Sequence, residues 1–157
     1  MAESGSSVPG LRLLYRAEVT IATPLVVGEV AAGTRRVIPV TGGSFRGPRL
    51  AGRVLPGGAD WQTLRRDDVT EVEARYTLQT DDGALIEVTN WGLRHGPPEV
   101  MARLAEGARV DPKSYYFRTT PRFSCGHPDY RWLNGVVAVA RAERHAEGVV
   151  LDVFEVT

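Results

Sequence analysis

The chain has 157 residues, 43% of them hydrophobic and 24% charged, which excludes a disordered protein and fits a globular one. Its 19 basic and 19 acidic residues cancel, so it lacks the positive field that binding to a nucleic-acid backbone requires. A single cysteine excludes an internal disulfide. With no long apolar run and no secretory signal, we expect a cytoplasmic protein that binds neither nucleic acid nor membrane.

The chain begins with a small polar segment and then becomes regular. We expect residues 1–10 to form a flexible tail and residues 11–157 to form one domain. Hydrophobic and polar residues alternate over most of the segment from Leu11 to Ile21. A period of two over this length predicts a half-buried β-strand.

Further short strands follow, separated by turns rich in glycine and proline. Asp82-Gly83 is a strong hairpin signal between two of them. One helix is predicted to begin at His95-Gly96-Pro97-Pro98 and to run to about Ala105, because proline suits the first helical turn and Gly107 can end the helix. The further predicted strands are residues 36–41, 49–55, 70–80, 84–91, 114–123, 134–144 and 148–156.

These elements predict an all-β fold with a single short helix. About eight strands joined by hairpins fit either an up-and-down barrel or a sandwich. We favour a closed or nearly closed antiparallel β-barrel, because closure removes exposed sheet edges and eight strands leave room for one small ligand.

The segment around residue 60 contains the first candidate for chemistry. Pro56, Gly57 and Gly58 predict a tight turn that delivers Asp60 and Trp61 together. A carboxylate beside an indole ring loses hydration, which raises its pKa and makes it a useful acid or base near neutral pH. The alternative is that Asp60 accepts backbone N–H bonds and shapes the turn.

A second candidate segment contains Tyr116, Arg118, Trp132 and Asn134. Tyr116 and Arg118 share one face of the predicted strand. An arginine inside a barrel needs an acidic partner, which we expect to be Asp60 or an acidic ligand. Trp132 and Asn134 would add a flat apolar wall and an amide group. The alternative is that these aromatic residues belong only to the core.

Signatures of metal binding and of nucleophilic catalysis are weak. His95, His127 and His145 lack the spacing of a metal site, so we expect no metal. Cys125 has His127 two residues later as its nearest base, and a thiol nucleophile there stays an open alternative.

Several of these segments together resemble the domain-of-unknown-function family DUF3237, also called UPF0311, of small bacterial and fungal proteins. The resemblance runs from about residue 11 to residue 157. It implies an antiparallel β-barrel of lipocalin-like or allene-oxide-cyclase-like shape, with no established cofactor and no settled reaction. The segments that carry it are Leu50-Ala51-Gly52-Arg53-Val54-Leu55-Pro56-Gly57-Gly58-Ala59-Asp60-Trp61, Ala74-Arg75-Tyr76, Asp82-Gly83, Tyr116-Phe117-Arg118-Thr119, Phe123 and Trp132-Leu133-Asn134.

The first functional hypothesis is a cofactor-free enzyme that cyclises or isomerises a small, oxygen-rich, aromatic or polyketide-like molecule. Asp60 would be the acid or base, and Arg118 would hold a carboxylate or enolate oxygen. The predicted substrate contacts are Trp61, Tyr76, Tyr116, Trp132 and Asn134.

Two other hypotheses stay open. The same pocket could serve a non-catalytic carrier or sensor, in which Asp60 would keep an ordinary pKa. A purely structural or partner-binding domain would have a lumen filled with apolar side chains instead of a cavity. Apolar strand positions that face outward would allow a homodimer.

Overall fold

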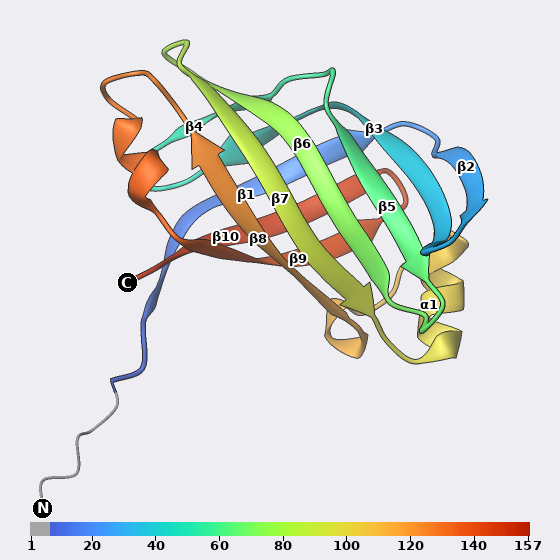
Figure 1. Cartoon of the computed structure of the whole chain (residues 1–157). Coiled ribbons are helices and arrows are strands. Elements are labelled where there is room, and N and C mark those ends of the chain that lie inside the picture. The colour runs from blue at the N-terminus through green and yellow to red at the C-terminus, as the bar shows by residue number, and fades with distance from the viewer. Residues whose placement is uncertain (1–6) are drawn as a thin grey trace, which may run out of the picture.

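The computed structural model describes residues 7–157 as one antiparallel sheet that closes on itself (Figure 1). The strands follow the order β1-β10-β9-β8-β7-β6-β4-β3-β2, and β1 also pairs with β3. This pairing closes eight strands into a barrel, to which β2 and β5 are added. The predicted closed antiparallel barrel of about eight strands with one short helix is therefore confirmed.

The elements are short enough for each to span the barrel once. Most strands have between 6 and 11 residues, and β3 with 14 residues is bent. The bounds are β1 (Leu11–Ile21), β2 (Leu25–Val30), β3 (Gly33–Arg46), β4 (Ala51–Val54), β5 (Ala59–Arg65), β6 (Thr70–Thr80), β7 (Leu85–His95), the helix α1 (Pro98–Ala105), the 3-10 helix η1 (Pro112–Ser114), β8 (Tyr116–Ser124), the 3-10 helix η2 (Arg131–Gly135), β9 (Ala138–His145) and β10 (Gly148–Val156).

Two strands lie where the sequence predicts none. In β2, exposed apolar residues follow one another without alternation, so the pattern does not resemble a half-buried strand. In β5, the usual alternation is disturbed, because the polar residues Asp60 and Gln62 point inward while Trp61 lies on the outer wall. A third difference is that residues 131–135 form η2, so the predicted strand 134–144 begins only at Ala138.

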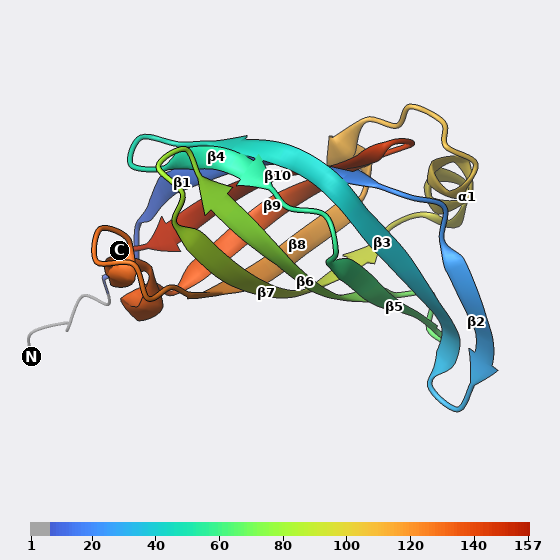
Figure 2. The same ribbon diagram turned by 90° about the horizontal axis from the view of Figure 1, so that it is seen from above.

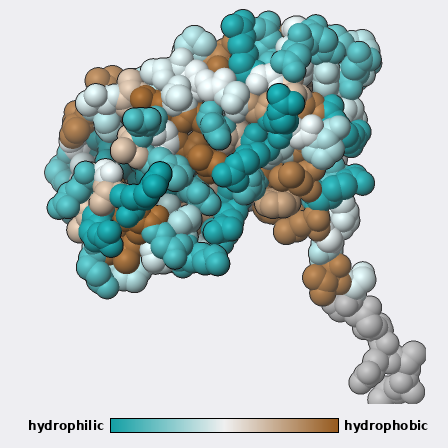
Figure 3. Space-filling model, turned by 180° about the vertical axis from the view of Figure 1, so that it is seen from behind, coloured by the Kyte–Doolittle hydropathy of each residue, from teal (hydrophilic) through white to brown (hydrophobic). Residues whose placement is uncertain are grey.

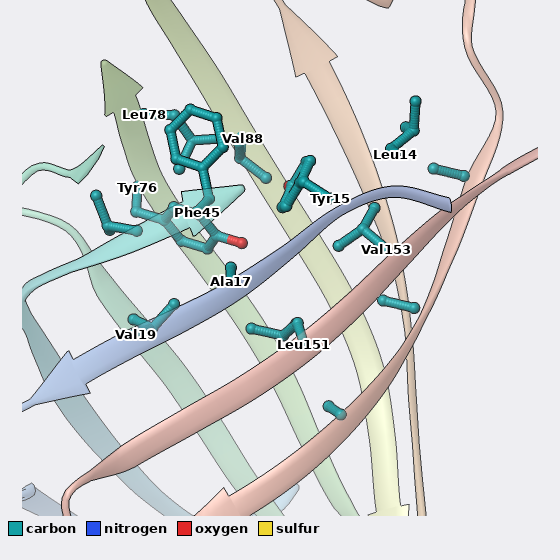
Figure 4. Packing of buried hydrophobic residues seen from close by; sticks show 14 of the residues in the cluster. Leu14, Tyr15, Ala17, Val19, Phe45, Tyr76, Leu78, Val88, Leu151 and Val153 are labelled. Atoms are coloured by element: carbon teal, nitrogen blue, oxygen red, sulfur yellow. The ribbon is translucent and has the colours of Figure 1, made fainter. Parts of the chain in front are cut away.

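The core is built from alternate residues of each strand. On β6, Val72, Tyr76 and Leu78 are buried, whereas Glu73, Arg75 and Thr77 face outward to varying degrees. The rings of Tyr15 and Phe45 meet edge to face with centroids 5.5 Å apart, and they pack with Tyr76 and Leu78 in the barrel interior (Figure 4). Side chains from β1, β3 and β6 thus fill much of the barrel.

The two ends of the barrel are covered differently. Helix α1 lies at the end toward which β2 extends, and η2 lies at the opposite end, near the C-terminus (Figures 1 and 2). Leu104 of α1 is buried, and Met101 packs against the core. This arrangement makes α1 the cover of one barrel opening.

The outside of the barrel is mostly polar with scattered apolar patches on the face seen in Figure 3. Within residues 7–157, none of the helices has the length and apolar character needed to span a bilayer. Most of the predicted tail, residues 1–6, lies outside the described residues. Gly10, at the end of that predicted tail, exchanges two backbone hydrogen bonds with Thr157.

Closure of the barrel depends on close contact between β1 and β3 at Gly43. Gly43 has φ of 136°, and a Cβ atom there would collide with the carbonyl oxygen of Glu18. We expect Gly43→Ala to lower the free energy of unfolding by about 2–3 kcal/mol in urea denaturation. Gly135→Ala is the control, because nothing lies within 4 Å of the position that its new methyl group would occupy. Equal stability of the two variants would contradict this account of closure.

Candidate functional site

The end of the barrel beneath α1 has a polar interior. Inward-facing residues near the other end, such as Phe45, Leu78 and Ile86, are apolar. At the α1 end, by contrast, five strands contribute polar side chains. These are Arg36 of β3, Asp60 and Gln62 of β5, Asn90 and Arg94 of β7, Thr119 of β8 and Arg144 of β9.

Two adjoining cavities occupy this polar end. The inner cavity has a volume of about 50 Å³ and is lined by apolar residues together with Asp60, Tyr76 and Asn90. The mouth cavity, of about 530 Å³, lies between α1 and the ends of the strands, and its wall includes Arg94. Arg144 lines both cavities, which places them next to each other. The mouth cavity has the size of a small-molecule site, and the inner cavity has room only for a small group.

Asp60 is the carboxylate of the inner cavity. Its Oδ2 accepts a hydrogen bond from Nε2 of Gln62 at 2.6 Å, and its Oδ1 accepts one from the backbone N–H of Glu73 at 3.1 Å. Burial raises the pKa of Asp60 above its ordinary value, although these hydrogen bonds and the nearby Arg94 and Arg36 oppose the shift. A carboxyl group with a raised pKa can act as a general acid or base.

Three arginines surround this carboxylate without forming an ion pair to it within residues 7–157. Arg36 donates from Nε to Oε1 of Gln62 at 2.8 Å. Arg144 donates from Nη1 to the carbonyl oxygens of His145 and of Gly148. Arg94 is only 4% exposed, and burial lowers its pKa to about 10, helped by repulsion from Arg36 and Arg144.

Several buried polar atoms at this end have no hydrogen-bond partner within the described part of the chain. They are the hydroxyl oxygens of Tyr76 and Thr119, Oδ1 of Asn90, and Nε and Nη1 of Arg94. Burial also raises the pKa of Tyr76 to about 12, so its hydroxyl stays protonated. Native proteins rarely leave buried polar groups unpaired, and such groups are available to a ligand with matching polar atoms.

The structure brings together two of the predicted site residues. Asp60 and Tyr76 both line the inner cavity, on the neighbouring strands β5 and β6. Trp61 does not join them, because consecutive residues of a strand point to opposite faces. Its side chain is 36% exposed on the outer wall. The expectation that Trp61 desolvates Asp60 is therefore wrong, and Val72 and Ala74 take that place in the wall of the cavity.

The expectation that Tyr116 and Arg118 point into the barrel is also wrong. The two residues do share a face of β8, but it is the outer one, since Phe117 and Thr119 are the buried residues. Tyr116 is 45% exposed. The Arg118 guanidinium donates to the carbonyl oxygen of Phe117 and lies over the Tyr116 ring. Arg118 therefore does not meet Asp60.

Trp132 and Asn134 lie in η2, at the barrel end opposite α1 (Figures 1 and 2). The Arg49 guanidinium lies 3.6 Å from the centre of the Trp132 ring. Asn134 binds the backbone of Cys125, accepting from its N–H at 2.9 Å and donating to its carbonyl oxygen at 2.7 Å. The predicted convergence of these two side chains with Asp60 is therefore wrong, and both hold a loop in place.

Cys125 is a buried free thiol, and Nδ1 of its neighbour His127 accepts from the backbone N–H of Asp129. Across residues 7–157, no three His, Cys, Asp or Glu side chains are grouped closely enough to hold a metal ion.

The sequence reasoning missed Arg36, Gln62, Arg94 and Arg144. A signal existed for Arg94, because it lies an even number of residues after Ile86, Val88 and Asn90 and so faces the same side of β7. It was missed because the predicted strand ended too early, at residue 91. No comparable signal marked Arg36 or Arg144. Each lies near the end of a strand, where alternation no longer distinguishes an inward position from an exposed one.

Comparison with known proteins identifies the family. The model of the family "Protein of unknown function (DUF3237)" matches residues 9–156, and the chain belongs to this family. A UPF0311 protein of Rhodopseudomonas palustris is 50% identical over 129 residues, which cover 82% of this chain and 84% of that protein. The crystal structure of the R. palustris protein RPA1785 matches with a TM-score of 0.91 and 42% identity, covering 97% of this chain and 99% of the other.

One similar protein has a named activity. The hydroalkoxylation enzyme phnH of the fungus Penicillium herquei is 28% identical over 130 residues, which cover 83% of this chain and 72% of the fungal protein.

The raised pKa of Asp60 can be measured directly. In a carboxyl ¹³C NMR titration, Asp60 should titrate above its ordinary value of 3.8, whereas exposed Asp67, paired with Arg65, should titrate below that value. Because the folded state favours protonated Asp60, the stability that this proton contributes is lost as the pH rises through the folded-state pKa.

Asp60→Asn should therefore gain in unfolding free energy relative to the wild type as the pH rises above about 4. Asp67→Asn should show the opposite trend, since its carboxylate is stabilised in the folded state. Titration of Asp60 at or below 3.8 would contradict the burial of this carboxyl group.

Proposed function

We propose that this DUF3237 protein is a cofactor-independent enzyme that cyclises or isomerises a small, oxygen-rich organic molecule by proton transfer at Asp60. The observation that carries the proposal is the position of Asp60. Its carboxyl group lies in the desolvated inner cavity, with a raised pKa, next to a mouth cavity of about 530 Å³. A carboxyl group with these properties suits general acid–base catalysis.

The named activity of the fungal relative supports this reaction class. Hydroalkoxylation adds an O–H group across a carbon–carbon double bond, so the intramolecular reaction is an isomerisation that closes an oxygen-containing ring. It consumes no oxidant or reductant. The fungal protein is 28% identical over 130 residues, and the same class of chemistry needs only what the lumen of this chain offers, a proton donor and acceptor.

The proton balance of such a cyclisation can be written with Asp60 alone. Protonated Asp60 donates its proton to one carbon of the substrate double bond, forming a C–H bond. The substrate hydroxyl oxygen attacks the other carbon and forms the C–O bond. The hydroxyl proton then passes to the Asp60 carboxylate, which restores the acid. One O–H bond and one π bond are lost, and one C–H bond and one C–O bond are gained.

The neighbours of Asp60 have roles that follow from their positions. Gln62 donates to Oδ2 of Asp60 and accepts from Arg36, so it fixes the orientation of the carboxyl group. Tyr76 and Asn90 line the same cavity, and their polar side-chain atoms can bind the reacting oxygen of the substrate.

A turnover assay tests the proposal. The probes are ortho-(3-methylbut-2-enyl)phenols with and without a ring carboxylate, which can close to cyclic ethers. In D₂O, the new C–H bond should be a C–D bond, detectable by NMR and mass spectrometry. We expect Asp60→Asn to lower the rate by about 100-fold or more, which is the usual contribution of a general acid or base.

Asp67→Asn is the matched control, because Asp67 is an exposed aspartate paired with Arg65 on the outer surface. It should keep the wild-type rate. An Asp60→Asn variant with undiminished turnover would contradict the proposed role. Tight binding of the probes without cyclisation or deuterium incorporation would instead support a non-catalytic carrier.

A further inference from the structure

The side chain of Arg94 is a buried cation, and two of its nitrogens lack a hydrogen-bond partner in the described part of the chain. It projects inward near the end of β7 and is 4% exposed, yet it lines the mouth cavity. Its Nε and Nη1 have no hydrogen-bond partner in residues 7–157, and its guanidinium lies 5.1 Å from the centre of the Phe117 ring. Burying a charge without a partner is costly, so this position requires an explanation.

The other two arginines of the mouth cavity differ from Arg94 in this respect. Arg36 uses Nε to bind Gln62, and Arg144 uses Nη1 to bind backbone carbonyl oxygens. Both guanidinium groups are thereby held in place. Nε and Nη1 of Arg94, in contrast, stay free for a group that enters the mouth cavity.

The charge around Arg94 favours an anion. Three arginines face Asp60, the one carboxylate of the inner cavity. Asp68 and Glu106 also line the mouth cavity, but both are exposed and neither forms an ion pair with these arginines. Met101 and Leu104 of α1 add apolar surface to the same cavity. The lining of the mouth cavity thus combines buried cationic side chains with apolar side chains of α1.

We infer that the mouth cavity binds a planar organic anion, whose paired oxygens are anchored by Arg94 and whose apolar body lies against α1. A carboxylate, or the two oxygens of a 1,3-dicarbonyl enolate, matches the planar fork of an arginine. The inference rests on the proposed function for the location of the substrate, and it assigns that substrate to the acidic phenols, enols and carboxylates. Arg94 thereby becomes a substrate-binding residue.

Salicylate is a suitable probe, because it is a planar aromatic carboxylate, and salicylamide is its neutral counterpart of nearly equal shape. Isothermal titration calorimetry at constant ionic strength should show salicylate binding about tenfold or more tightly than salicylamide. Arg94→Gln should weaken salicylate binding by a similar factor and remove the preference for the anion. Arg118→Gln, which changes an arginine on the outer wall, should bind like the wild type.

Thermal unfolding gives a second readout, which a merely structural arginine would not produce. Without ligand, Arg94→Met should raise the melting temperature, because it removes an unpaired buried charge. Salicylate should raise the melting temperature of the wild type but not that of Arg94→Met. A lower melting temperature of the unliganded variant, or salicylate binding unaffected by Arg94→Gln, would overturn the inference. So would equal binding of salicylate and salicylamide, or no binding of salicylate.

The Asp60→Asn variant separates this inference from the proposed function. It should still bind salicylate, because the substitution leaves the free Nε and Nη1 of Arg94 in place and adds no negative charge. Turnover of neutral phenols without salicylate binding would leave the proposed function standing and refute the anion site. Salicylate binding through Arg94 without any turnover would leave the anion site standing and refute the proposed function.

Discussion

The closure of β1 onto β3 is the constraint on which the rest of the structure depends. Without this pairing, the inward faces of the strands would form an open sheet exposed to water. Closure instead encloses Asp60 and Arg94 together with the apolar core, and it removes most of the solvent that would otherwise screen them. The raised pKa of Asp60 and the lowered pKa of Arg94 both follow from this enclosure.

The two ends of the barrel interior differ in polarity: one end is apolar and stabilises the fold, and the other is polar and contains the candidate site. Tyr15, Phe45 and Leu78 pack tightly in the apolar part and support the barrel. The α1 end instead accepts polar groups whose hydrogen bonds are incomplete, which costs stability. Proteins retain such costs mainly at functional sites, because the unpaired groups become favourable when a ligand binds them. The cavities under α1 fit this pattern.

Sequence patterns predicted the barrel and two residues of the candidate site, Asp60 and Tyr76. Alternation on β6 placed Tyr76 on the buried face, and the hairpin at Asp82-Gly83 joined β6 to β7. Alternation fixes which residues share a face but not which face is inside, and on β8 aromatic residues occupy both faces. The predicted role of Arg118 therefore pointed to the wrong side of the wall. Strand β5 could not be predicted from alternation, because its inward residues Asp60 and Gln62 are polar and the exposed residue between them is Trp61.

The central claim is that the polar end of the lumen is a ligand site organised around Arg94 and Asp60. A high-resolution crystal structure of the protein soaked with salicylate tests it most directly. We expect the carboxylate of salicylate within hydrogen-bond distance of Nε and of an Nη atom of Arg94, with the ring against Met101 and Leu104 of α1. Salicylate bound only on the outer wall, or an Arg94 side chain that turns out of the barrel into solvent, would contradict it.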